Sequence, residues 1–333
     1  MLLHRFPQNV VALASMLFLQ TLFVLRRLGN PTLLLLPVLV LAVEPLRAEL
    51  NVVATTTDLG SIAREIAGDL AKVTSIAKGY QDPHFIDAKP SYLVRLQRAD
   101  LFVLVGMDLE RGWAPNLLMN SRNAKIQRGG AGYVDASEGV DKLQIPVAAD
   151  RTMGDIHPYG NPHYWLDPAN GRIIAANIAA GLIRVDPAHA QEYEANLRAF
   201  LARLEAALAR WAEDAAALEG LAVVAYHDSW PYFEQRFGFE AVAFVEPKPG
   251  IPPSGRYIAA LVEEMKSRRI SIILMTSFYS SKTARLIARQ SGATLVTLGQ
   301  SVDGIDGADD YFSLFDTNLS LLLQAAREGQ GGR

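Results

Sequence analysis

The strongest constraint on the fold is that short β-branched runs alternate with helical stretches in two sets, separated by one long helical segment. Such alternation is typical of βαβ units and parallel sheets. In the first set we expect strands at Leu50–Thr55, Val73–Ala77 and Leu101–Val105, and helices near Leu59–Ala67 and Tyr92–Arg98.

The second set begins after residue 219 and repeats the alternation. Its expected strands are Leu221–Ala225, Ala241–Val245, Ile270–Met275 and Thr294–Leu298, and its helices lie near Trp230–Phe237, Ser254–Arg268 and Lys282–Ser291. A closing amphipathic helix is expected over Tyr311–Glu328. The sequence therefore predicts an α/β chain with two Rossmann-like parallel-sheet lobes.

The segment between the sets, Pro187–Glu219, is rich in Ala, Leu, Glu and Arg, with leucines at helical spacing. Pro187 suits an early helical position, and Gly220 suits a stop. A helix of roughly 30 residues is about 45 Å long, enough to run along both lobes. We expect a long rigid helix over 187–219 that joins an N-terminal lobe, 49–186, to a C-terminal lobe, 220–333.

The first 48 residues differ from the rest. The basic pair Arg26 and Arg27 precedes an eleven-residue apolar run, Leu33–Val43, and a small-residue site ends at Ala48. This order predicts a signal peptide over residues 1–48. A retained anchor is the alternative, but the run is shorter than the ~20 apolar residues of a membrane-spanning helix and contains Pro37.

The chain contains no cysteine, so it has no thiolate ligand and no residue that could carry a lipoprotein's lipid. We expect a periplasmic monomer. Removing residues 1–48 takes away four of the 32 Lys/Arg and one of the 35 Asp/Glu, which leaves a net charge of about −6. An acidic protein disfavours nucleic acid as a partner and favours a cationic one.

Three histidines lie in loops where a ligand-binding residue would be expected. His84 and His163 each follow a proline, in Asp-Pro-His and Asn-Pro-His, and His227 follows the strand Leu221–Ala225. A preceding proline restricts the backbone, and ligands of parallel sheets bind at the carboxyl ends of strands. His189, on the long helix, is interpreted as structural, and His157 as a possible accessory ligand.

Neutral imidazoles with a carboxylate suit zinc, whereas manganese or iron(II) becomes favourable as oxygen ligands are added. A ligating histidine usually donates its second ring N–H to a nearby acceptor. The candidate acceptors are Asp82, Asp167, Asp228 and Glu246.

Several motifs occur in an order that resembles the zinc and manganese substrate-binding proteins of ABC importers, the zinc-uptake solute-binding family of cluster A-I. They are Gln81-Asp82-Pro83-His84 with Lys89-Pro90-Ser91, Asn161-Pro162-His163-Tyr164-Trp165-Leu166-Asp167-Pro168, His227-Asp228-Ser229-Trp230-Pro231-Tyr232-Phe233 with Phe237-Gly238, and Asp310-Tyr311-Phe312 with Asn318.

The resemblance implies two α/β lobes joined by a rigid helix, with a metal ion held between them and handed to a membrane permease. It makes His84, His163 and His227 the ligands. The fourth ligand of the family is a carboxylate or solvent in the loop before the closing helix, and here we take Asp303.

These observations predict an extracytoplasmic protein that binds a divalent transition metal, zinc above all, with high affinity and delivers it to an ABC permease. A manganese or iron(II) receptor of the same family is the alternative. An extracellular zinc hydrolase is a further one, because three histidines can leave a position for activated water. A shell nearly filled by three imidazoles and a carboxylate favours capture, so we do not expect an enzyme.

Overall fold

The structure is a computed structural model, and it describes residues 49–147 and 157–331. The predicted signal peptide, residues 1–48, lies outside the described residues. The described residues all belong to one compact unit. None of the helices in the described part of the chain has the length and apolar character that crossing a membrane requires.

The first four-stranded sheet found in the described residues is wholly parallel, with strand order β2-β1-β3-β4. Its strands are β1 (Leu50–Ala54), β2 (Ala71–Ser75), β3 (Leu101–Leu104) and β4 (Tyr133–Asp135). The helices of this half are α2 (Thr57–Ala67), α3 (Pro90–Arg98), α4 (Ala114–Ser121) and α5 (Gly171–Val185). The 3₁₀ turns η4 (Tyr164–Leu166) and η5 (Pro168–Asn170) lead into α5.

The second sheet is also parallel, with order β6-β5-β7-β8. Its strands are β5 (Ala222–Ala225), β6 (Glu240–Phe244), β7 (Ile272–Thr276) and β8 (Thr294–Leu298). Its helices are α7 (Pro231–Phe237), α8 (Gly255–Arg268), α9 (Ser281–Ser291) and α10 (Tyr311–Gly331). Two parallel sheets flanked by helices confirm the predicted fold class.

Local sequence explains where these helices begin and end. The Thr56 and Ser254 hydroxyls accept hydrogen bonds from the first turns of α2 and α8, which satisfies amide groups that have no partner within the helix. Gly238 and Gly292 end α7 and α9 with φ angles of 75° and 81°, a left-handed conformation that glycine adopts without steric cost.

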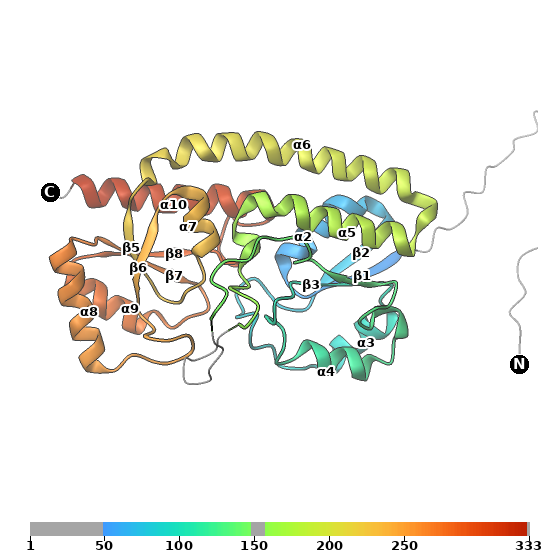
Figure 1. Cartoon of the computed structure of the whole chain (residues 1–333), viewed down its shortest axis with the longest axis horizontal. Helices are drawn as coiled ribbons and strands as arrows, with labels where there is room; N and C mark the ends of the chain where they lie inside the picture. The colour runs from blue at the N-terminus through green and yellow to red at the C-terminus, as the bar shows by residue number, and fades with distance from the viewer. Residues whose placement is uncertain (1–48, 148–156, 332–333) are drawn as a thin grey trace, which may run out of the picture. The chain divides into compact units, whose positions relative to one another are not determined.

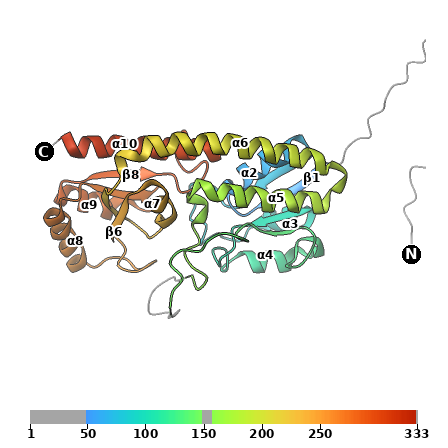
Figure 2. The same cartoon turned by 45° about the horizontal axis from the view of Figure 1, so that its top comes forward.

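The long helix α6 (Ala190–Ala215) lies where the sequence predicts it. The 3₁₀ turns η6 (Pro187–His189) and η7 (Ala216–Leu218) extend it at both ends, so the chain is helical from 187 to 218. Figures 1 and 2 show α6 running along both sheets, and it packs against α2, α5 and α10. The domain boundaries at 186/187 and 219/220 stay a prediction.

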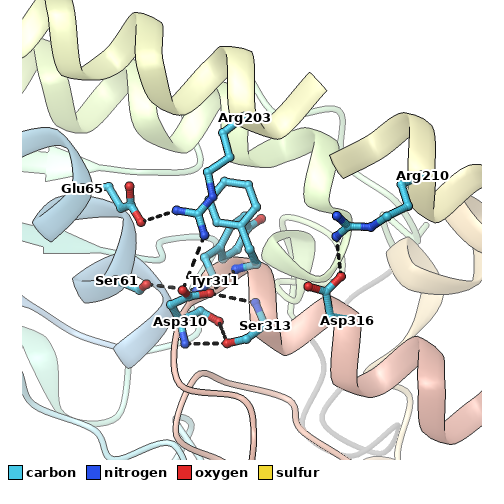
Figure 3. Close-up of polar contacts among 9 residues, drawn as sticks. Ser61, Glu65, Arg203, Arg210, Asp310, Tyr311, Ser313 and Asp316 are labelled. Carbon is cyan, nitrogen blue, oxygen red and sulfur yellow. Dashed lines mark hydrogen bonds and ion pairs between the residues drawn. The ribbon is translucent and has the colours of Figure 1, made fainter. Parts of the chain in front are cut away.

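Ion pairs connect α6 to both halves (Figure 3). Arg203 lies 2.8 Å from Glu65 of α2 and 3.6 Å from Asp310, which precedes α10. Seven residues further along α6, Arg210 pairs with Asp316 of α10 at 2.6 Å. Ion pairs near the middle of α6 therefore connect it to one helix of each half.

The two halves also touch directly at the start of α2. The Thr57 hydroxyl donates to the carbonyl of Val302, and the Val302 N–H donates to the Asp58 carboxylate at 2.9 Å. The Tyr311 N–H donates to the Ser61 hydroxyl at 3.0 Å (Figure 3). These contacts place the loop between β8 and α10 against the first half.

Three elements were absent from the sequence prediction: α4, β4 and the fifteen-residue α5. Some expected boundaries were also wrong by one to three residues. For example, β2 begins at Ala71, before the expected start at Val73, and α10 continues to Gly331.

Candidate metal centre

Three predicted ligands come together from distant parts of the sequence. His84 lies in the loop after β2, His163 immediately before η4, and His227 in the loop after β5. One ring nitrogen can be chosen from each histidine so that the three nitrogens all lie within 4.8 Å of one another. His163 is only 1% exposed, and the other two are part-buried. Both halves of the fold therefore contribute to one cluster, here called the three-histidine group.

The hydrogen bonds of His163 define which ring nitrogen can bind a cation. Its Nδ1 lies 2.8 Å from Asn161 Oδ1. The Asn161 Nδ2 donates to the carbonyl of Asp228, an acceptor only, so Oδ1 must be the accepting atom and His163 Nδ1 carries the proton. The lone pair is then on Nε2, which is buried and has no hydrogen-bond partner among the residues that the structure describes. An uncompensated buried acceptor of this kind fits a metal ligand.

His84 and His227 are oriented in the same way by carboxylates. His84 Nδ1 lies 2.7 Å from Asp82, and His227 Nδ1 lies 2.9 Å from Glu246. An ionised carboxylate only accepts, so each Nδ1 carries the proton and each Nε2 presents a lone pair. Burial raises the pKa of Asp82, but the hydrogen bond and charge of His84 lower it by more, so this carboxyl titrates below its ordinary value.

Burial, together with the neighbouring histidines, holds the pKa of His163 well below its ordinary value. The ring is therefore neutral at physiological pH, which is the form that binds a metal ion. The group therefore combines fixed tautomers with an imidazole, His163, whose lowered pKa keeps it neutral at physiological pH.

A cavity of about 190 Å³ adjoins the group. Organic ligands occupy pockets of roughly 300–1,000 Å³, so this volume suits an ion better than a metabolite. Its lining residues are Gln144, His157, Asn161, Pro162, His163, His227, Asp228 and Pro249.

The structure does not bring Asp303 to this group. Asp303 is exposed and has a φ of 60°, and its N–H donates to the carbonyl of Ala308 in a turn. Among the described residues the group contains no carboxylate. The choice of Asp303 as fourth ligand stays a prediction that this geometry does not support.

The structure also describes His157 and His189, and the accessory role expected for His157 stays a prediction. His157 Nε2 is 3.1 Å from His84 Nε2, beside the three-histidine group. His189 lies on the turn before α6, where its Nδ1 contacts Asp186 at 2.6 Å.

Two of the four candidate acceptors, Asp82 and Glu246, contact histidines of the three-histidine group. The other two have different partners: Asp167 binds Arg236, and Asp228 accepts from Gln144.

The acceptor for His163 is Asn161, which the sequence reasoning missed. The sequence did contain a signal. Asn161-Pro162-His163 repeats the spacing of Asp82-Pro83-His84, and in both motifs the first side chain accepts from the histidine's own backbone N–H as well as from its ring.

Comparisons with known proteins identify the family of the chain. A profile of the family described as "Zinc-uptake complex component A periplasmic" (ZnuA) matches residues 52–325. The manganese ABC transporter substrate-binding lipoprotein PsaA of Streptococcus pneumoniae is 27% identical over 296 residues, which cover 83% of this chain and 88% of that protein. The iron ABC transporter substrate-binding lipoprotein MtsA of Streptococcus pyogenes serotype M1 is 28% identical over 285 residues, covering 83% and 88%.

A crystal structure of ZnuA superposes with a TM-score of 0.69 at 25% identity, covering 84% of this chain and 99% of that one. The matched family consists of solute-binding transport components, so it gives no support to the hydrolase alternative. The chain belongs to the ZnuA family, the substrate-binding components of metal ABC importers.

Proposed function

We propose that this protein captures zinc outside the cytoplasm and delivers it to the membrane permease of an ABC importer. His84, His163 and His227 would bind the ion through their Nε2 atoms. The observation that carries the proposal is the donor set: a group of three imidazoles that includes no carboxylate among the described residues.

The family alone leaves the metal open, because the relatives PsaA and MtsA are named for manganese and iron. The donor set favours zinc. Manganese and iron(II) gain from carboxylate and other oxygen ligands, whereas zinc accepts three or four imidazoles in a tetrahedral shell. Asp82 and Glu246 contact the opposite ring nitrogens of His84 and His227, where they orient the histidines.

The proposed location is the periplasm, which the signal-like residues 1–48 support. PsaA and MtsA are named as lipoproteins, but this chain has no cysteine to carry a lipid. We propose a soluble monomer with the permease as partner. The acidic charge balance after residue 48 supports a cationic cargo and no nucleic-acid partner.

A competition titration tests the choice of metal. The chelator-treated protein is titrated with zinc against a chromophoric chelator, first alone and then with excess manganese or, without oxygen, iron(II). We expect one tight zinc ion per chain that a hundredfold excess of manganese does not displace. Equal affinities would reassign the protein to manganese or iron uptake, and no tight site would remove the metal-binding proposal.

A further inference from the structure

We infer that His157 is the fourth zinc ligand, so that the loaded site is a shell of four imidazoles. This inference rests on the proposed function and deepens it, because it assigns the position for which Asp303 is the sequence prediction. It also supplies a physical reason for selecting zinc over metals that prefer oxygen.

The contact between His157 and His84 has a defined direction. His84 Nδ1–H is directed to Asp82, so neutral His84 has only a lone pair on Nε2. The 3.1 Å contact between the two Nε2 atoms is therefore a hydrogen bond that His157 donates. His157 offers a proton at the place where His84 would bind a cation.

The distance also matches a coordination shell. In tetrahedral zinc sites the Zn–N distance is about 2.0–2.1 Å, which places two ligand nitrogens ~3.3 Å apart. The two Nε2 atoms at 3.1 Å lie close to that separation. A zinc ion that reaches His84 Nε2 therefore needs little change in the distance between these two rings.

The backbone around His157 holds it beside the group. Its carbonyl accepts from the Gly160 N–H in a tight turn, and the Asn161 N–H donates to the carbonyl of Leu143. His157 also lines the same cavity as His163 and His227. It is outside the three-histidine group itself, so binding requires its ring to move toward the other donors.

Coordination by His157 requires a change of tautomer. The proton on Nε2 is lost to solvent and Nδ1 gains one, so the ring stays neutral and its Nε2 lone pair binds the ion. The shell then contains four neutral nitrogen donors and no oxygen donor. Zinc tolerates such a shell, whereas manganese loses the carboxylate ligands that it prefers.

Zinc K-edge X-ray absorption of the zinc-loaded protein counts the imidazoles directly. We expect four in the wild type and three in His157→Ala, with zinc affinity lowered at least ~10-fold in the variant. His157→Asp supplies an oxygen donor at the same position. It should retain more zinc affinity than His157→Ala and reduce the preference for zinc over manganese.

His189→Ala is the matched control, because it removes a histidine that contacts Asp186 away from the site. It should bind zinc like the wild type. Three imidazoles in the wild type, with unchanged affinity in His157→Ala, would overturn the inference and leave the proposed zinc receptor intact. The absence of any tight zinc site in the wild type would overturn both.

Discussion

At the residue scale, the candidate site depends on hydrogen bonds that hold each histidine by Nδ1. Asp82, Asn161 and Glu246 fix the three rings, and the lone pair of each Nε2 can then bind a metal ion. Because the orientation is set by the protein, less side-chain freedom is lost when an ion binds. His163 has the most complete version of this arrangement, since it is also fully buried.

Replacing His163 by alanine should lower zinc affinity by at least about 10-fold. The change removes a ring whose Nε2 has no hydrogen-bond partner among residues 49–147 and 157–331, and it leaves the Asn161 amide oxygen with the backbone N–H of residue 163. Competition with a chromophoric chelator measures the dissociation constant. His189→Ala serves as the control, and wild-type affinity in His163→Ala would exclude His163 from the site.

Sequence motifs were sufficient to find the three histidines and two of their acceptors, because those residues follow strands or sit in proline-restricted loops. The fourth ligand stays a prediction. The backbone at Asp303 adopts a left-handed turn closed by a hydrogen bond to the carbonyl of Ala308, and spacing does not encode that turn. The contact between His84 and His157 joins positions 73 residues apart, which no local pattern reports.

At the element scale, amphipathic periodicity predicted α6 but not α5. One face of α6 is exposed, so its buried residues recur at helical spacing against charged ones. By contrast, α5 packs against both α2 and α6 and is apolar over much of its circumference, which weakens the contrast between faces. The strand β4 has only three residues, too few for an alternating pattern.

The middle of α6 is where one side chain contacts both halves. Arg203 pairs with Glu65 and Asp310, and its guanidinium carbon lies 3.8 Å from the centroid of the Phe312 ring. Exposed ion pairs contribute little individually, but here two pairs and a cation–π contact share one guanidinium group.

We expect Arg203→Ala to lower the free energy of unfolding by about 1 kcal/mol. Arg198→Ala on the same helix removes a single 3.9 Å pair with Glu194 and should cost less than about 0.5 kcal/mol. Both changes have the same effect on helix propensity, so their difference isolates the contacts between elements. Urea unfolding of the chelator-treated variants measures both free energies of unfolding. Equal losses in Arg203→Ala and Arg198→Ala would show that the contacts of Arg203 with the two halves do not stabilise the fold.

At the scale of the whole molecule, the two halves meet through a buried carboxyl group. Asp58 is fully buried at the start of α2 and accepts the Val302 N–H from the second half. Its Oδ2 atom has no hydrogen-bond partner within the described part of the chain. Burial raises the pKa of Asp58 from 3.8 to about 7, even though hydrogen bonds lower it in part.

This raised pKa makes stability fall as the pH rises. Between pH 3.8 and about 7 the folded protein retains a proton on Asp58 that the unfolded chain has lost, so the cost of ionising the buried group is complete only above pH 7. Glu110, whose pKa burial also raises to about 7, adds a cost of the same sign.

Asp58→Asn removes this proton equilibrium while keeping an oxygen that can accept from Val302. Relative to the wild type, the variant should gain roughly 2 to 3 kcal/mol of unfolding free energy between pH 5 and pH 8. Urea unfolding at the two pH values, with chelator present so that metal binding does not contribute, gives this difference. Asp69→Asn is the control, because Asp69 is exposed just after α2. Its difference in unfolding free energy from the wild type should be the same at both pH values. A parallel change in the unfolding free energy of Asp58→Asn and the wild type would contradict this prediction. It would mean that the Asp58 carboxyl group has the same pKa in the folded and the unfolded protein, so that its burial has no pH-dependent cost.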